Sequence, residues 1–256
     1  MFLRLVQLKV DPERISEMKD RYEQEIISEL ATVPGCLYAG LVRSTRRREQ
    51  VMSVTLWESV RQAEEYEQSG LFSALLDKTR PYFHEADEWK LDLSEDLRLE
   101  YRAVPVEPVV KSYAGPSSAP ALDADNQHCT YFRFVSMVVQ PGRIEEFRSL
   151  YQNQVLPTLR DVPGCCYIQL AQNLEEPNEF ISFTLWKSRQ QADAYERSGM
   201  FTLLRDVLRP ALSELSRWQM DAEDTPGTVA ATHEDMSVQS YTVLTGKSFV
   251  NTRGKN

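Results

Sequence analysis

Hydrophobic and polar residues alternate over residues 2–10, and hydrophobic residues then recur every three or four positions after Asp11-Pro12-Glu13. Alternation is typical of a strand, and an aspartate followed by a proline is typical of a helix start. The sequence therefore predicts a strand over residues 2–10 and a helix ending near Val33-Pro34-Gly35. The buried positions of this helix are expected to be Ile15, Met18, Tyr22, Ile26 and Leu30.

The next hydrophobic runs, residues 36–42 and 50–57, flank a polar loop at 44–49 and predict a β-hairpin. Helical periodicity then resumes at Ser59 and is interrupted at Ser69-Gly70, which predicts two short helices in succession. The second is expected to end near Arg80-Pro81 or to extend through Trp89. A final strand over residues 105–113 closes this part of the chain.

The whole pattern then repeats. Leu56-Trp57-Glu58-Ser59 returns as Leu185-Trp186-Lys187-Ser188, 129 positions later, and Val33-Pro34-Gly35-Cys36 returns at the same spacing as Val162-Pro163-Gly164-Cys165. Between residues 53 and 81, 16 of 29 positions are identical to those 129 residues later, without an insertion. A repeat of this length indicates a duplicated domain rather than a short solenoid unit.

Each copy has the element order βαββααβ, which is the ferredoxin-like α+β pattern of an antiparallel sheet with helices on one face. We expect two such modules, packed sheet to sheet as an intramolecular pseudo-dimeric α+β barrel. The expected boundaries are a first module at residues 1–113, a linker at 114–128, a second module at 129–250 and a tail at 251–256. The linker is rich in Gly, Pro, Ser and Ala.

One polar stripe repeats on the third strand of each module. By the period of two, Ser53, Thr55 and Trp57 share one face, and the second copy repeats them as Ser182, Thr184 and Trp186. The opposite face is apolar and is expected to pack on the helices. The polar stripe would then point between the two sheets, where tryptophan and hydroxyl groups suit an aromatic ligand; plain core packing is the alternative.

Composition narrows the classes of partner. The net charge is -9 and the pI is near 5.0, which disfavour nucleic-acid binding and membrane-surface binding. The one basic run, Arg46-Arg47-Arg48, is interpreted as a solvated hairpin tip. We expect a pseudo-dimer within one chain. The sequence leaves open whether the chain associates further and whether it binds a small aromatic ligand.

The N-terminus and the four cysteines predict a cytoplasmic protein. The apolar run at the N-terminus is too short and too charged for a signal sequence, and no stretch of the sequence approaches 18 consecutive apolar residues. Cys36 and Cys165 lie at equivalent positions without metal-ligand spacing. A vicinal Cys165–Cys166 disulfide is conceivable, but small apolar strand residues are the favoured interpretation.

The LWES and LWKS segments, the Ser-Gly-x-Phe helix starts and the Val-Pro-Gly turns resemble the antibiotic biosynthesis monooxygenase (ABM) family of dimeric α+β barrels. This resemblance covers most of each copy. In the polyketide-oxidising members a tryptophan lines the active site, with an asparagine four residues earlier. Trp57 and Trp186 match the tryptophan, whereas Ser53 and Ser182 stand at the asparagine position.

The same superfamily contains haem-degrading enzymes, whose axial histidine would fall at Leu76 and Arg205 and whose tryptophan would fall at Tyr66 and Tyr195. Axial haem ligation at that position is therefore excluded in both copies. The chain also has no Gly-rich phosphate loop, no Cys/His metal cluster and no nucleophile elbow. The resemblance thus implies an enzyme that needs no cofactor.

Other repeated residues are weaker candidates. Arg4 and Arg133 could stabilise an anion inside the barrel, although an outward arginine that covers apolar surface is the favoured interpretation. Tyr66 and Tyr195 are candidate substrate-binding groups or core packing. The resemblance implies a cofactor-independent monooxygenase acting on a small aromatic or polyphenolic substrate with O2, or alternatively a non-catalytic ligand-binding or structural barrel.

Overall fold

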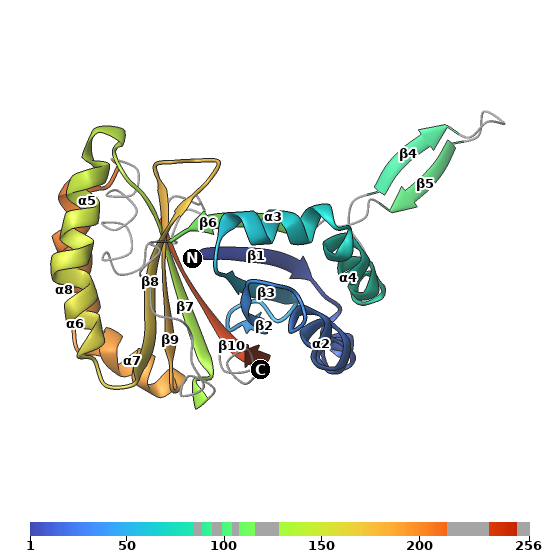
Figure 1. Cartoon of the computed structure of the whole chain (residues 1–256), viewed down its shortest axis with the longest axis horizontal. Coiled ribbons are helices and arrows are strands. Elements are labelled where there is room, and N and C mark those ends of the chain that lie inside the picture. Colours follow the sequence, from blue (N-terminus) through green and yellow to red (C-terminus); the bar gives the residue numbers. More distant parts are fainter. Residues whose placement is uncertain (84–88, 94–98, 104–107, 116–127, 214–235, 250–256) are drawn as a thin grey trace.

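The computed structural model describes residues 1–83, 89–93, 99–103, 108–115, 128–213 and 236–249 (Figure 1). The linker expected at 114–128 lies almost entirely outside these residues, and the tail expected at 251–256 lies wholly outside them.

Eight strands form one closed barrel in the order β1-β3-β2-β10-β7-β9-β8-β6. All the strand pairs are antiparallel. This is the α+β barrel that the sequence predicts. The strands are β1 (Phe2–Lys9), β2 (Cys36–Ser44), β3 (Gln50–Trp57), β6 (Val109–Ala114), β7 (Tyr131–Val138), β8 (Cys165–Asn173), β9 (Glu179–Trp186) and β10 (Met236–Ser248).

The last strand of each module joins it to the other module. Strand β10 pairs with β7 of its own module and, on its other edge, with β2, from Tyr241 opposite Ser44 to Ser248 opposite Tyr38. Strand β6 likewise pairs with β1 and then with β8. The two modules therefore share one continuous hydrogen-bonded sheet, and neither has a closed sheet of its own.

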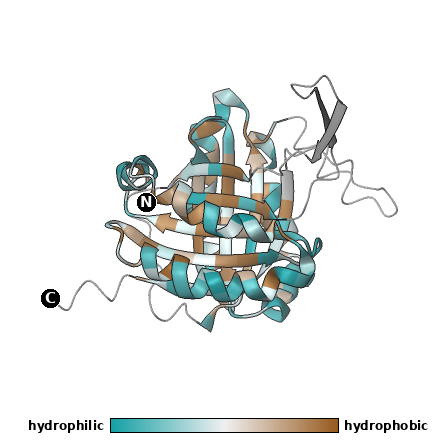
Figure 2. Cartoon of the chain, turned by 90° about the vertical axis from the view of Figure 1, so that its right-hand side faces the viewer, coloured by the Kyte–Doolittle hydropathy of each residue, from teal (hydrophilic) through white to brown (hydrophobic). Residues whose placement is uncertain are grey.

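The helices lie outside the barrel, one set over each module's strands (Figure 1). Figure 2 shows hydrophilic residues on the outward helix faces and hydrophobic residues along the strands. The first set is α1 (Ile15–Arg21), η2 (Tyr22–Ile26), α2 (Ile27–Leu30), α3 (Val60–Gln68) and α4 (Leu71–Thr79), and the second is α5 (Ile144–Leu150), η6 (Tyr151–Val155), α6 (Leu156–Arg160), α7 (Arg189–Arg197) and α8 (Met200–Leu208).

Short 3-10 turns lie beside the helices, and two further strands stand apart from the barrel. The turns are η1 (Pro12–Arg14), η3 (Arg80–Tyr82), η5 (Pro141–Arg143) and η7 (Arg209–Ala211). Strands β4 (Trp89–Leu93) and β5 (Leu99–Ala103) pair only with each other in a two-stranded sheet.

The predicted break between the paired helices is present in both modules. Gly70 and Gly199 have φ of 79° and 78°, in the left-handed region that glycine adopts without strain, and α4 and α8 begin directly after them. Helix α4 ends at Thr79, and Pro81 lies in the following turn η3. Of the two predicted ends, the one near Arg80-Pro81 is thus correct, and Trp89 belongs to a strand.

The predicted orientation of the third strand is wrong. The barrel interior is filled by the apolar face, including Val54 and Leu56 of β3 together with Phe132, Phe134 and Phe183 of the second module. The polar stripe faces the helices, where Trp57 joins the first helix-covered core and Trp186 the second. Both faces of the barrel sheet carry buried residues, so the alternation of residues defines two faces without showing which one the helices cover.

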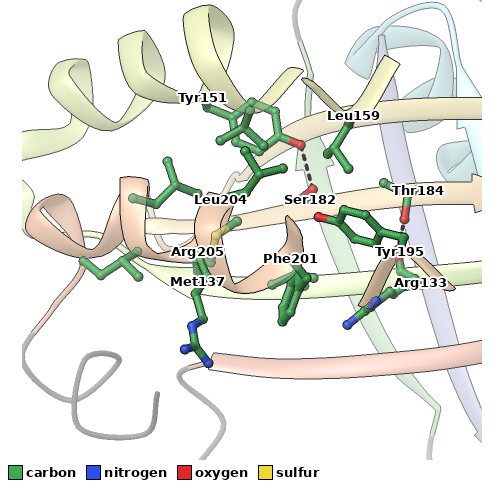
Figure 3. A pocket seen from close by; sticks show the side chains of 14 residues that line it. Arg133, Met137, Tyr151, Leu159, Ser182, Thr184, Tyr195, Phe201, Leu204 and Arg205 are labelled. Carbon is green, nitrogen blue, oxygen red and sulfur yellow. Dashed lines mark hydrogen bonds between the residues drawn. The ribbon is translucent and has the colours of Figure 1, made fainter. Parts of the chain in front are cut away.

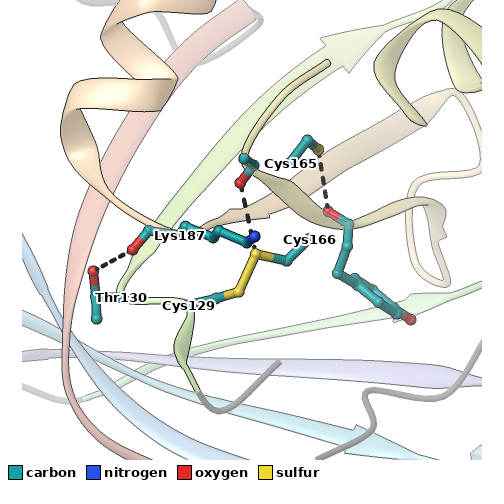
Figure 4. Close-up of a disulfide and its surroundings, with 7 residues drawn as sticks. Cys129, Thr130, Cys165, Cys166 and Lys187 are labelled. Atoms are coloured by element: carbon teal, nitrogen blue, oxygen red, sulfur yellow. Dashed lines mark hydrogen bonds between the residues drawn. A yellow bond between two sulfur atoms is a disulfide. The ribbon is translucent and has the colours of Figure 1, made fainter. Parts of the chain in front are cut away.

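A disulfide joins Cys129 to Cys166 in the second module (Figure 4). Cys129 precedes β7, and Cys166 lies at the start of β8. The expectation that Cys166 is simply a small apolar strand residue is therefore wrong, because the fold brings together two cysteines 37 positions apart. Cys36 and Cys165 are not disulfide-bonded, and burial raises the pKa of Cys165 to about 12.

Among the described residues, every helix is too short or too polar to cross a bilayer.

Candidate functional site

Each module has a pocket between the outer face of its sheet and the helices that cover it. The second pocket encloses about 530 Å³ of space between atoms and the first about 470 Å³, and both volumes include space open to solvent. The second pocket is lined by Arg133, Val135, Met137, Tyr151, Val155, Leu159, Ser182, Thr184, Tyr195, Phe201, Leu204, Arg205, Leu208 and Leu212 (Figure 3).

The first pocket has nearly the same wall, displaced by 129 residues. It is lined by Arg4, Val6, Leu8, Tyr22, Ile26, Leu30, Ser53, Thr55, Tyr66, Phe72, Leu75, Leu76 and Thr79. Only two of these positions differ in polarity between the pockets. Apolar Leu76 of the first pocket corresponds to Arg205 of the second, and polar Thr79 corresponds to Leu208. A mostly apolar cavity with a few convergent polar groups is the usual composition of a small-molecule site.

A tyrosine and a serine form the polar floor of each pocket. The Tyr151 hydroxyl lies 2.6 Å from Ser182 Oγ, and the Tyr22 hydroxyl lies 2.7 Å from Ser53 Oγ. Each tyrosine opens a π-helical turn, η2 or η6, inside the long first helix of its module. Such π-bulges are rare and occur frequently at functional sites, because the extra residue re-aims side chains on one helix face.

The tryptophans lie behind the pocket lining. Trp57 Nε1 donates a hydrogen bond of 3.0 Å to Thr55 Oγ1, and Trp186 Nε1 donates one of 2.8 Å to Thr184 Oγ1. Both indoles are fully buried, and neither contributes to the lining. The indole therefore orients the threonine hydroxyl that borders the pocket.

Tyr66 and Tyr195 connect the tryptophans to the pockets. Tyr66 stacks on Trp57 at 4.9 Å between ring centroids, and Tyr195 stacks on Trp186 at 5.2 Å, while both tyrosines line their pockets. Burial raises the pKa of both phenols, an effect that the nearby guanidinium of Arg4 or Arg133 partly opposes. Burial likewise raises the pKa of Tyr22 and Tyr151. All four phenols therefore stay protonated near neutral pH and act as hydrogen-bond donors rather than bases.

Arg4 and Arg133 occupy equivalent places at the edge of the two pockets. They are 4% and 3% exposed, so the outward orientation favoured from the sequence is wrong, and they lie on the helix side of the sheet rather than inside the barrel. Arg4 Nη2 contacts Glu67 Oε2 at 2.7 Å, and Arg133 Nη2 lies 3.4 Å from Glu196 Oε2. The Nε of each arginine is buried and donates no hydrogen bond to a described residue.

The structure thus gathers most of the predicted residues, though not in the predicted place. Arg, Ser, Thr and Tyr from both copies line the pockets, whereas Trp57 and Trp186 stand one layer behind. The helical period of the sequence places Tyr22 and Tyr151 in the helix core, and it does not show that they meet the serines. The available signal was a tyrosine repeated on a helix face that is otherwise largely aliphatic.

Neither lining contains a histidine or cysteine, and in the described part of the chain no group of three or more His, Cys, Asp or Glu residues is placed to hold a metal ion. The haem-ligand position implied by the resemblance holds Leu76 in the first pocket and Arg205 in the second, and neither residue fits an axial haem ligand.

Known structures share this fold along the whole chain. A candidate monooxygenase from Lactobacillus acidophilus superposes with a TM-score of 0.62 at 10% identity, covering 97% of this chain and 96% of its own. One from Fusobacterium nucleatum gives 0.60 at 11% identity, covering 96% and 94%. An anthrone oxidase-like protein gives 0.57 at 13% identity, covering 97% and 93%. At these identities the likeness shows the fold alone.

No curated protein matches the sequence. The sequence profile described as "Antibiotic biosynthesis monooxygenase" matches it twice, over residues 1–78 and 130–206, which together make up more than half of the chain and coincide with the two pocket-bearing modules. The chain therefore belongs to the antibiotic biosynthesis monooxygenase family, as a tandem duplication of its domain.

Proposed function

We propose that the protein is a cofactor-independent monooxygenase that oxidises a small aromatic or polyphenolic substrate with O2 in its two helix-covered pockets. The observation that carries this proposal is the polar set of Arg, Tyr, Ser and Thr that recurs in both cavities at one spacing. The apolar walls suit an aromatic ring, and the polar groups suit its oxygen substituents.

The reaction needs a substrate that is acidic enough to lose a proton to solvent water and form a delocalised carbanion. The carbanion transfers electrons to O2 and forms a C–O bond. The peroxide anion then takes a proton back from water, and the resulting hydroperoxide loses water. A ring CH2 group and O2 thereby become C=O and H2O. In this scheme the protein binds and orients the substrate and stabilises its negative charge.

The described residues divide these tasks. The guanidinium groups of Arg4 and Arg133, with buried Nε atoms, would stabilise the charge of the substrate anion. The Tyr22–Ser53 and Tyr151–Ser182 pairs would hydrogen-bond a substrate oxygen. The four protonated phenols are poor bases, so the acidity of the substrate itself supplies the carbanion.

Oxygen uptake tests the proposal. Anthrone-like and hydroquinone substrates are expected to consume O2 faster with the protein than in buffer. Arg4→Met together with Arg133→Met is expected to lower the rate by about 100-fold, which is typical of removing a charge-stabilising donor. Arg21→Met is the matched control, because Arg21 lies outside both pockets, where it contacts Glu25 of the same helix and Tyr82 of turn η3.

The main alternative is a non-catalytic ligand-binding protein. It is favoured by Ser53 and Ser182, which stand where the resemblance implies an asparagine and whose hydroxyls are engaged by tyrosine. Binding of the same compounds without O2 uptake, in protein whose two arginines are intact, would establish that alternative.

A further inference from the structure

Aromatic rings hold one arginine of each pocket in place. The guanidinium carbon of Arg4 lies 5.5 Å from the ring centres of both Phe2 and Phe72, and that of Arg133 lies 4.4 Å from the ring centre of Phe201. A guanidinium over an aromatic face is attracted to the ring whether or not a carboxylate is present. Packing on these rings therefore fixes the position of each cation.

The carboxylate partner of each arginine is held less firmly. Glu67 Oε2 contacts Arg4 at 2.7 Å and Glu196 Oε2 lies 3.4 Å from Arg133, but the glutamate side chains are 54% and 56% exposed. Within the described residues, the side chain of neither glutamate makes another hydrogen bond or ion pair. A half-exposed side chain with one contact can exchange that contact for water at small cost. Each glutamate can therefore leave while its arginine stays.

Both arginines line their pockets, whereas neither glutamate does. The Nε atom of each arginine is buried and donates no hydrogen bond to a described residue, and the same holds for Arg4 Nη1 and Arg133 Nη2. A buried charged donor without an acceptor is costly. Because a guanidinium has five N–H donors, an oxyanion inside the pocket can satisfy some that the glutamate at the rim leaves without an acceptor.

We infer that Glu67 and Glu196 are resident counterions: each neutralises its arginine while the pocket is empty, and the oxyanion of an aromatic substrate displaces it. The substrate class is an ionised phenol or enol, bound with its oxygen against the guanidinium. This inference deepens the proposed function and rests on it only in treating the pockets as substrate sites. Because glutamate and substrate compete for one cation, the glutamate lowers the affinity for the anion.

The test uses 4-nitrophenol, which ionises near neutral pH and whose phenolate absorbs visible light, so absorbance reports how much of the bound compound is ionised. The full chain is expected to raise the phenolate fraction. The double variant Glu67→Gln, Glu196→Gln is expected to bind phenolate about fivefold more tightly, the effect of removing a competing half-exposed ion pair. Its affinity for 4-nitroanisole, which cannot ionise, is expected to change by less than about twofold.

The matched control is the double variant Glu64→Gln, Asp193→Asn. It removes the same amount of negative charge from the same two helices, α3 and α7. Among the described residues, neither carboxylate pairs with Arg4 or Arg133, and Asp193 pairs with Arg189 instead. Since charges at the surface are screened by salt, phenolate affinity of this control is expected to stay within about twofold of the wild type.

Melting temperatures separate displacement of the glutamates from a folding defect. Without ligand, Glu67→Gln, Glu196→Gln is expected to melt below the wild type, because two buried cations have lost their counterions. Saturating phenolate is expected to remove most of that difference, since the anion takes the place of the missing carboxylate. Saturating 4-nitroanisole is expected to leave the difference as it is.

Phenolate affinity that is equal in the wild type and Glu67→Gln, Glu196→Gln, or lower in the variant, would overturn the inference. No phenolate binding, or an equal gain in the control variant, would also overturn it. Tighter phenolate binding by the glutamate variant, without O2 uptake from any substrate, would support the inference while the proposed function fails. O2 uptake that depends on the arginines, with phenolate affinity unaffected by the glutamates, would support the proposed function while the inference fails.

Discussion

The hydroxyl of Tyr151 lies 2.6 Å from Ser182 Oγ, deep between the first helix and the sheet of the second module. Its repeat, Tyr22 with Ser53, has the same geometry at 2.7 Å, and there the tyrosine hydroxyl also donates to the carbonyl oxygen of Gly40 at 3.3 Å. Each pair joins a π-helical turn to the third strand of its module.

We expect Tyr151→Phe to lower the free energy of unfolding by about 1–3 kcal/mol, because it leaves the Ser182 hydroxyl buried without its partner. Adding Ser182→Ala is expected to recover much of this loss, since removing both partners leaves no unsatisfied group. Urea unfolding of the two single variants and the double variant measures the coupling. Strictly additive losses would show that the hydrogen bond contributes nothing to stability.

Trp186→Phe tests whether the indole orients Thr184. The substitution keeps an aromatic ring near Tyr195 but removes the Nε1–H that donates to Thr184 Oγ1 at 2.8 Å. If the proposed function is correct, oxygen uptake by the second pocket is expected to fall by about tenfold, equivalent to roughly 1.4 kcal/mol of transition-state stabilisation. The measurement is made in an Arg4→Met background, where the first pocket is impaired. An unchanged rate would assign the indole to packing alone.

The Cys129–Cys166 disulfide closes a loop with a sequence separation of 37. In the chain-entropy model, a loop of this length stabilises the folded state by about 4 kcal/mol. The double variant Cys129→Ala, Cys166→Ala is therefore expected to melt at a lower temperature than the oxidised protein and to be insensitive to reductant. Cys36→Ala is the control, because it removes a buried cysteine that is not disulfide-bonded. Identical melting of the oxidised and reduced wild type would contradict the prediction.

Stability is expected to fall at alkaline pH. Burial raises the pKa of Tyr22 and Tyr151, and that of Tyr113 to about 12, so these phenols stay neutral in the folded chain where an unfolded tyrosine ionises, near pH 10. Their contribution is complete below about pH 10 and is lost as pH rises toward the folded pKa. Urea unfolding from about pH 8 to about pH 11, with tyrosinate absorbance, checks this. A flat stability profile over that range would be inconsistent with buried neutral phenols.

The sequence predicts the elements of this fold well because each depends on local pattern. Neighbouring residues determine the strand alternation, the helix break at Gly70 and the turn at Pro81. The internal repeat shows each of these patterns in both modules. The orientation of the polar stripe could not be obtained in this way. It depends on whether aromatic residues such as Phe134 and Phe183 fill the barrel, which is a property of the assembled sheet.

The site was predictable in composition but not in position. The internal repeat marks Ser53, Thr55 and Arg4 as candidate site residues, whereas nothing in the sequence places Tyr22 or Arg205 at this pocket. Tyr22 follows the helical period of the core, and Arg205 breaks the repeat with Leu76. To place Tyr22 and Arg205 at the pockets, one must know which face of each helix packs against which strand.

The pairing of β2 with β10 imposes an order on folding during synthesis. Residues 36–44 leave the ribosome about 200 positions before residues 236–248, which at about 5–20 residues per second is a delay of roughly 10–40 s. Throughout that time the β2 edge lacks the strand that covers it in the finished barrel, and an open edge invites pairing with other chains. The β2 edge of the nascent first module therefore stays unpaired until the last strand, β10, has been synthesised.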